Sequence, residues 1–296
     1  MWLWIGFHVF ILMLLSLDLG VSKKRALKPS KALFLSLGWM GIALLFNGFV
    51  YWYLGSEKAV EFFTAYLIEK SLSVDNLFVF MLIFSSFSVP QHLQYKILYL
   101  GILGAFALRL IMILSGVYLI TMFHWLTYLL GMIVAITGIC LILKKKNSTN
   151  IQQNWLLKWI RSRYPVTGDY VGDQFFVVRN GVKFLTPLFL VLIAVESSDV
   201  IFALDSIPAV LGITHDPFVA YTSNVFAVLG LRSLYFLLAP WIDLFPHFKK
   251  GLGVILGFIG MKMILSPFFE ISLLTSLAVI VTVIVFSILY SVAKKF

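Results

Sequence analysis

The sequence predicts an all-α, polytopic membrane protein, because of its composition and the spacing of its apolar segments. Of its 296 residues, 61% are hydrophobic and only 12% are charged, and the mean hydropathy is +0.99. Apolar runs of about 20 residues recur along the chain, and a helix of that length crosses a hydrocarbon core about 30 Å thick. The alternation typical of a transmembrane barrel strand is absent, so a helical bundle is the only arrangement that satisfies the backbone in lipid.

About nine transmembrane helices are expected from these runs. The first run has neither the basic start nor the small-residue cleavage site of a removable signal peptide, so it counts as a span. The eighth run is short enough to be partly re-entrant. The predicted spans are residues 2–21, 32–53, 60–87, 97–120, 123–143, 185–211, 218–240, 250–266 and 271–292.

Lysine and arginine predict that the N-terminus lies outside and the C-terminus inside. With nine spans in this orientation, 18 basic residues fall in inner connections, one in an outer connection and four within spans. Cytoplasmic connections carry such an excess of positive residues, and an even number of spans would destroy it. The net charge of +10 is therefore interpreted as a topology signal and as contact with anionic lipid, not as a nucleic-acid-binding surface.

The one long connection, residues 144–184, is predicted to be cytoplasmic. It begins with the polar linker KKKNSTNIQQN, and the following WLLKWIRSRY has the basic and aromatic pattern of an amphipathic helix on a membrane surface. Further on, two β-like runs flank Asn180-Gly181, the commonest two-residue hairpin turn, so a small β-hairpin is expected there.

Two three-helix units of the sequence resemble each other. SVDNLFVF at 73–80 aligns with SSDVIFAL at 197–204, and Arg109 aligns with Arg232. The separation from aspartate to arginine is 34 residues in the first unit and 33 in the second. Because each unit has an odd number of spans, the second inserts upside down relative to the first. Inverted repeats of this kind are typical of secondary transporters, whose substrate sites lie near the midplane between the repeats.

The alignment has a second possible register, in which Asp75 pairs with Asp205. Pairing Asp75 with Asp199 is favoured, because both then lie near the middle of their spans. The chain accordingly divides into two N-terminal helices (1–58), a first repeat (59–143), a cytoplasmic loop (144–184), a second repeat (185–267) and a C-terminal helix (268–296).

Five carboxylates lie away from the ends of two repeat-related spans, the third and the sixth. Ionisable side chains at membrane depth are costly, and they usually mark an ion or substrate pathway. Glu196 and Asp199 are three residues apart and so share a helix face. With a neighbouring asparagine, the candidate ligands of a cation are Glu69, Asp75, Asn76, Glu196, Asp199 and Asp205.

This set offers only oxygen ligands. Pro208 has no N–H for the carbonyl of Leu204, so a kink is expected to free a backbone oxygen beside Asp205. Such oxygens suit hard divalent cations, and they do not separate Mn²⁺ from Mg²⁺ or Ca²⁺. A single cysteine, Cys140, and histidines that never pair at ligand spacing exclude a zinc or copper site of the Cys/His kind.

Basic residues within the spans allow another interpretation, in which the acids only form structural salt bridges. Arg109 and Arg232 are expected to neutralise the acids while the site is empty and to release them to the ion. A structural role suits Lys70 and Lys262 better, because lysine side chains can snorkel to the interface. Two further candidates for an additional site or for gating are Asp18 and Asn224.

Three strings resemble the TerC family, in particular its Alx-like members, and the likeness runs from about residue 17 to 265. They are LDLGV, GSEKAVEFFTAYLIEKSLSVDNLFVF and VESSDVIFALDSIPAVLGITHDPFVAYTSNVFAVLGLRSLYFLL. The resemblance implies a manganese exporter of the bacterial inner membrane, related to LysE-type transporters. It places the ion site on the acidic positions named above.

The expected partners are the lipid bilayer, a divalent cation as substrate and protons as counter-ion, with no permanently bound cofactor and no nucleic acid. No P-loop is present, so ATP does not drive transport directly, whereas carboxylates that bind a divalent ion can bind protons instead. One alternative is a membrane scaffold that transports nothing. The other is an intramembrane aspartyl protease with Asp75 and Asp199 as its pair, although its GxGD string is missing. The oligomeric state is not predicted.

Overall fold

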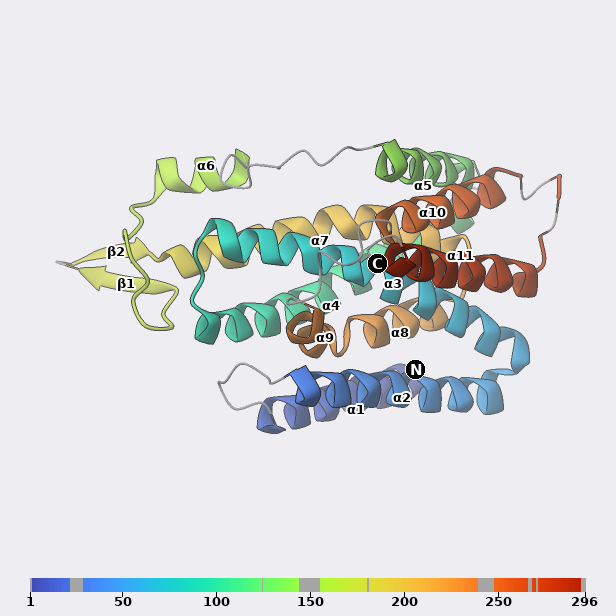
Figure 1. Cartoon of the computed structure of the whole chain (residues 1–296), viewed down its shortest axis with the longest axis horizontal. Helices are drawn as coiled ribbons and strands as arrows, with labels where there is room; N and C mark the ends of the chain where they lie inside the picture. The colour runs from blue at the N-terminus through green and yellow to red at the C-terminus, as the bar shows by residue number, and fades with distance from the viewer. Residues whose placement is uncertain are drawn as a thin grey trace.

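A computed structural model describes residues 2–21, 29–123, 125–143, 155–179, 181–238, 248–265, 268–269 and 271–293. Within these ranges the chain is all-α except for one small hairpin (Figure 1). The helices are α1 (Trp2–Val21), α2 (Pro29–Leu54), α3 (Ser56–Ser86), α4 (Gln91–Met122), α5 (Leu126–Leu143), α6 (Trp155–Arg163), α7 (Pro187–Leu211), α8 (Pro217–Val228), α9 (Leu231–Leu238), α10 (Phe248–Leu265) and α11 (Leu273–Ala293). The strands are β1 (Phe176–Arg179) and β2 (Val182–Leu185).

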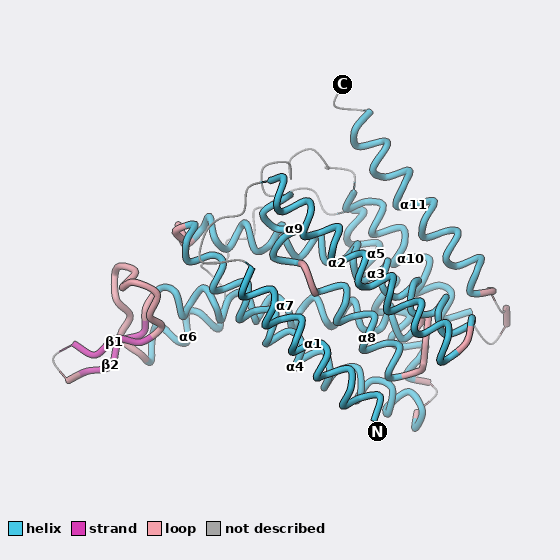
Figure 2. The backbone as a smooth tube through the Cα atoms, turned by 90° about the horizontal axis from the view of Figure 1, so that it is seen from below, coloured by secondary structure: helices cyan, strands magenta, loops and turns pink. Residues whose placement is uncertain are grey.

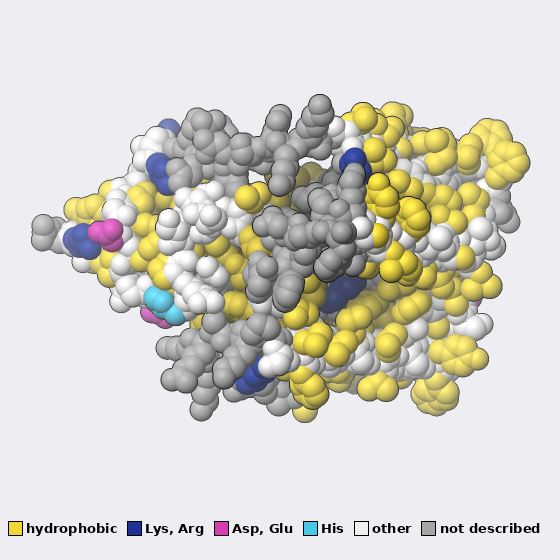
Figure 3. Space-filling view, viewed as in Figure 1, with side chains coloured by type: hydrophobic (Ala, Val, Ile, Leu, Met, Phe, Trp, Pro, Cys, Tyr) yellow, Lys and Arg dark blue, Asp and Glu magenta, His cyan; other side chains and the backbone are white. Residues whose placement is uncertain are grey.

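The surface and the helix lengths are those of an integral membrane protein. In the described part of the chain, four helices are long and apolar enough to cross a membrane, within α2, α4, α7 and α11. Large apolar side chains point outward, among them Trp52 and Phe34, which are 80% and 75% exposed. Hydrophobic side chains dominate the right-hand part of the face in Figure 3, which is the surface that lipid chains would cover.

The predicted span 218–240 is not one continuous helix. Asp216 caps the start of α8, because its Oδ1 accepts hydrogen bonds from the amides of Phe218 and Val219. The helix then stops at Val228, and Gly230 has a φ of +78°, a conformation that favours glycine. A second short helix, α9, follows. The break therefore divides the expected span in two, whereas α7 runs on through Pro208 to its end.

The bundle is built around α3, which packs against α2, α7, α8 and α11, and α4 packs against α7 and α8. The closest pair is α5 with α10. A Cβ added to Gly138 of α5 would lie 2.5 Å from the carbonyl oxygen of Gly253 of α10. Glycines thus bring these two backbones into direct contact, as small residues do in membrane helix pairs.

A two-stranded hairpin and α6 project from one end of the bundle (Figures 1 and 2). The strands pair antiparallel with Val178 opposite Lys183, at the place where the sequence predicts a hairpin. Gly181 has a φ of +77°, and its predicted turn partner Asn180 lies outside the described residues. The hydroxyl of Tyr170 donates to the carbonyl of Phe87 at 2.8 Å, and burial raises the pKa of Tyr170 to about 12. The segment before the hairpin is thereby fastened to the α3–α4 turn.

Candidate functional site

A buried cluster of polar side chains centres on Arg109 of α4. Its Nη1 donates to Oε2 of Glu69 at 2.6 Å and to Oδ1 of Asn224 at 2.7 Å. Its Nε lies 3.9 Å from Oδ2 of Asp199. All four residues are at most 5% exposed. Because Glu69, Asp199 and Asn224 belong to α3, α7 and α8, the cluster joins four helices in the interior of the bundle.

Two glycines of α4 let α7 come close enough to form this cluster. A Cβ added to Gly101 would lie 3.1 Å from Val195 Cγ1. A Cβ added to Gly104 would overlap both carboxylate oxygens of Glu196. Glu196 is therefore packed against the backbone of α4 at Gly104. Gly104 is five residues before Arg109, a separation of about 7.5 Å along the helix axis. The carboxylate of Glu196 approaches the cluster without an ion-pair contact to Arg109 among the described pairs.

Several buried atoms of the cluster have no hydrogen-bond partner. They are Glu69 Oε1, Asp199 Oδ2, Arg109 Nε and Asn224 Nδ2. More than nine in ten buried polar groups in proteins are hydrogen-bonded, so four unsatisfied atoms in one cluster need a physical reason. Two of them are carboxylate oxygens. Hard cations take such oxygens as ligands, which makes the cluster chemically suited to a divalent ion.

The structure brings together only part of the predicted ligand set. Asn76 is buried on α3, seven residues after Glu69 and so on the same helix face. Arg232 is buried in the first turn of α9, beyond the break. The side chains of Asp18, Asp75 and Asp205 lie outside the described residues, although α1, α3 and α7 carry them. Among the side chains that are described, no three of His, Cys, Asp and Glu group as a metal centre would.

Two charged residues of α3 outside the predicted ligand set lie in the interior, and sequence reasoning missed one of them, Glu61. Glu61 is 7% exposed and accepts hydrogen bonds from Lys58 and Thr214. Lys70 was given a structural role because it can snorkel to the interface, and its Nζ instead donates to the backbone carbonyls of Ala227 and Leu229 at the helix break. The signal for Glu61 was its place inside the predicted span 60–87. The signal for the Lys70 contact was an isolated glycine, Gly230, within an apolar run.

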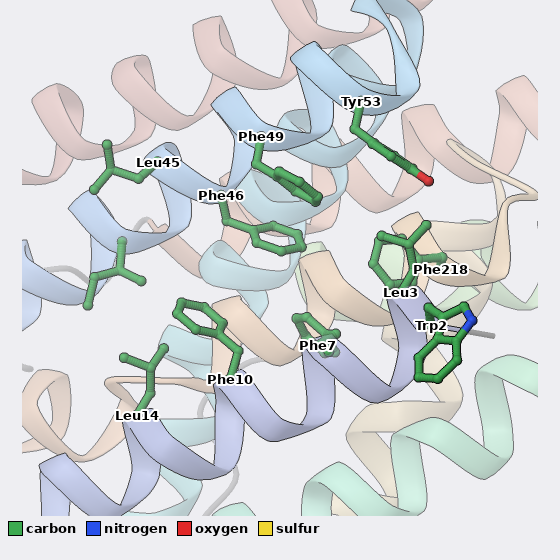
Figure 4. A pocket seen from close by; sticks show the side chains of 12 residues that line it. Trp2, Leu3, Phe7, Phe10, Leu14, Leu45, Phe46, Phe49, Tyr53 and Phe218 are labelled. Carbon is green, nitrogen blue, oxygen red and sulfur yellow. The ribbon is translucent and has the colours of Figure 1, made fainter.

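An apolar groove of about 690 Å³ lies apart from the cluster, between α1 and α2 (Figure 4). Phe7 and Phe10 of α1 face Phe46 and Phe49 of α2 across it, and Phe218 of α8 contributes to its lining. None of its lining residues is charged, so the groove offers no carboxylate to a cation. The cluster around Arg109 is the candidate site.

Comparison with known proteins identifies the family. The family described as "Integral membrane protein TerC family" matches residues 54–295. A Myxococcus xanthus protein named "Uncharacterized membrane protein STKORF319" is 45% identical over 99% of this chain and 92% of its own length. The "Putative membrane-bound redox modulator Alx" of Escherichia coli K12 is 44% identical over 96% of this chain and 92% of its own. No solved structure matches the chain. The chain therefore belongs to the TerC family of integral membrane proteins.

Proposed function

We propose that this protein exports a divalent metal cation across the bacterial inner membrane, and that the cation passes through the cluster around Arg109. The observation that carries the proposal is the pairing of one buried guanidinium with two carboxylates from different helices. The oxygens of Glu69 and Asp199 that accept no hydrogen bond support it, because a cation needs free lone pairs. The family resemblance favours Mn²⁺, and the oxygen ligands suit it as well as Mg²⁺ or Ca²⁺.

The proposed step is an exchange of cations at the two carboxylates. With no metal ion bound, Arg109 pairs with Glu69 and Asp199, and its single positive charge balances one of their two negative charges. A divalent ion that binds between the two carboxylates cancels both charges and leaves the guanidinium with its amide partner, Asn224. Nearby acids, among them Glu196, then serve as the next ligands along the pathway. A proton that replaces the metal ion on one of these carboxylates, while Arg109 pairs with the other, would balance both charges in the metal-free state and couple export to the proton gradient.

Helix packing supports the proposed inverted repeat. In the first unit the helices are α3, α4 and α5, and in the second they are α7, α8 with α9, and α10. The first helix of each unit packs against the second helix of the other, α3 on α8 and α7 on α4. The third helices, α5 and α10, pack on each other. A two-fold exchange of the units preserves these contacts, as expected of inverted repeats with the substrate site between them.

The ends of several helices support the proposed nine-span, N-outside orientation. In Figure 1, α1 ends and both α2 and α7 begin at the end of the molecule that carries the hairpin. That end also carries the exposed basic residues Arg161, Arg163 and Lys183. Since positive residues gather on the cytoplasmic side, this end is assigned to the cytoplasm.

The word "redox" in the names of the Alx relatives does not require thiol chemistry here. A dithiol–disulfide couple within one chain needs two cysteines, and this chain has only Cys140. A metal exporter would instead influence redox state through the amount of redox-active metal in the cytosol. The name is thus compatible with export of Mn²⁺.

The test is Mn²⁺ uptake into inside-out vesicles at matched expression. We expect saturable uptake by the wild type, and a loss of at least about tenfold in D75N and D199N, because each removes a ligand charge. The control is E57Q, which neutralises an exposed carboxylate in the first turn of α3 and should leave uptake unchanged. Unimpaired uptake in both aspartate variants would mean that the site is wrong.

Proton coupling has its own test in the same vesicles. Collapsing an imposed pH gradient should slow Mn²⁺ uptake severalfold. A Mn²⁺ uptake rate that does not depend on the pH gradient would refute proton coupling, but it would not contradict the proposed cation site. Negligible uptake in every vesicle preparation, with other divalent ions also tried, would favour the scaffold interpretation.

A further inference from the structure

The break between α8 and α9 leaves backbone carbonyls without helical partners in the interior. The last carbonyls of any α-helix lack intrahelical donors. Here the helix end is buried, since Ala227, Val228 and Leu229 are at most 3% exposed. A buried carbonyl that accepts no hydrogen bond is costly, so these groups require a donor from elsewhere in the protein.

Lys70 of α3 supplies that donor. Its Nζ lies 3.1 Å from the carbonyl oxygen of Ala227 and 3.3 Å from that of Leu229. The ammonium also sits at the C-terminal end of α8, where the helix dipole favours a positive charge. Among the described side chains, no carboxylate lies within 4.0 Å of Lys70 Nζ. Two backbone oxygens are thus its partners there, while its neighbour Glu69 binds Arg109.

The opposite side of the break is closed by α2. A Cβ added to Gly230 would lie 2.7 Å from the ring of Trp39, so the turn is packed against that indole. The hydroxyl of Ser233 donates to the Gly230 carbonyl at 2.8 Å, and that of Ser36 donates to Ser233 at 3.1 Å. The break is therefore covered on one side by α2, and on the other side the ammonium group of Lys70 contacts its carbonyls.

We propose that the α8–α9 break is a binding site for a primary ammonium group, and that Lys70 fills it from within the chain as a positioning residue. Carbonyls at the ends of broken membrane helices hold monovalent cations in transporters, and an ammonium satisfies the same oxygens. The site holds the end of α8 in place about one turn from Asn224, which contacts Arg109. Gly230, at the break, is two residues before Arg232 at the start of α9. It is distinct from the proposed divalent-cation site, and its geometry holds whether or not the protein transports metal.

Chemical rescue of a truncated lysine tests the site without any transport assay. K70A removes the three methylenes and the amine that propylammonium would put back. We expect the melting temperature of purified K70A, followed by tryptophan fluorescence, to fall by about 5 °C, because two hydrogen bonds to a charged donor are lost. Millimolar propylammonium should restore more than half of that loss. Propyltrimethylammonium, which has the charge but no N–H, should restore none.

The matched control is K262A. Lys262 is also a lysine within the bundle, but it donates to a single hydroxyl, that of Ser276. We expect propylammonium to leave the melting temperatures of K262A and of the wild type unchanged. A K70A protein that melts like the wild type would overturn the proposal, and so would a loss that propylammonium does not reverse or that propyltrimethylammonium reverses equally.

A second variant, K70M, is used for the test if K70A does not fold. K70M keeps the length of the side chain but has no donor, and it leaves no space for the added amine. We expect a lowered melting temperature that propylammonium does not change. A K70M protein as stable as the wild type would show that the carbonyls need no ammonium, and it would overturn the proposal whatever the outcome of the Mn²⁺ experiments.

Discussion

Arg109 is central to the charge balance of the interior, because its guanidinium forms ion pairs with two buried carboxylates. A guanidinium has several N–H donors in one plane, so it can bind Glu69 and Asn224 and still face Asp199. A lysine has one nitrogen and could not span the three partners. The amide of Asn224 keeps its own Nδ2 unbonded, which leaves a donor available to a shifted carboxylate.

Removal of this guanidinium should be strongly destabilising. In R109Q the carboxylates of Glu69 and Asp199 remain buried without their cation, which typically costs about 3–5 kcal/mol. We expect a melting temperature roughly 10 °C below that of the wild type, and altered Mn²⁺ flux, while membrane insertion is retained. The control R163Q changes an exposed arginine of α6 and should melt like the wild type.

A double variant separates charge pairing from packing in this prediction. R109Q/E69Q removes one of the uncompensated carboxylates together with the arginine. Its melting temperature should therefore lie above that expected from the sum of the two single changes, with a coupling of about 1–3 kcal/mol. Strict additivity, or an R109Q protein as stable as the wild type, would contradict the assigned ion pairs.

Among the helices, the close approach of α4 and α7 is what positions Glu196 and Asp199 of α7. Gly101 and Gly104 leave no side chain between the two backbones, so Val195 and Glu196 fit directly against α4. A larger residue at either glycine would move α7 outward. Asp199, three residues beyond Glu196 on the same face, would then move away from Arg109.

G104A is expected to disturb the site through a single methyl group. The new Cβ would overlap the carboxylate of Glu196, and overpacking of this kind costs about 1–3 kcal/mol. We expect a lower melting temperature and weaker Mn²⁺ uptake. In the control G48A nothing lies within 4 Å of the new Cβ in α2, so stability should be equal or slightly higher. Equal behaviour of the two variants would refute the close contact.

The places of most helices follow from the sequence, whereas the contacts of the site do not. Long apolar runs locate α2, α4, α7 and α11, because lipid thickness fixes the length of a spanning helix. The break at Gly230 is not predictable in the same way, since glycine is tolerated within membrane helices. The sequence assigns a depth to Glu69 and Arg109, but the pairing with Asn224 depends on which way four helices are rotated.

On the scale of the whole molecule, the two proposed units form an interlocked centre. The helices α3 and α4 of one unit pack on α8 and α7 of the other, and the cluster around Arg109 lies at this junction. The helices α1 and α2 lie along one flank of the bundle (Figure 1). Alternating access in transporters proceeds by motion of one repeat against the other around a fixed site. If the protein transports a cation as proposed, this junction is where that motion would occur.

The orientation of the molecule can be measured by cysteine labelling. Cys140 is the one native cysteine, so C140S gives a background for single introduced thiols. We expect V182C in the hairpin to react only with reagent on the cytoplasmic side. E57C, at the exposed start of α3, should react only from outside. Labelling of both positions from one side would contradict the proposed orientation.

Equilibrium binding of Mn²⁺ to the purified protein, followed by electron paramagnetic resonance, tests most directly whether the buried acids hold a cation. We predict one saturable site in the wild type, with affinity at least about tenfold weaker in both E69Q and D199N and unchanged in E57Q. Wild-type affinity in E69Q and D199N would contradict the account, because Arg109 would then pair with carboxylates that take no part in cation binding.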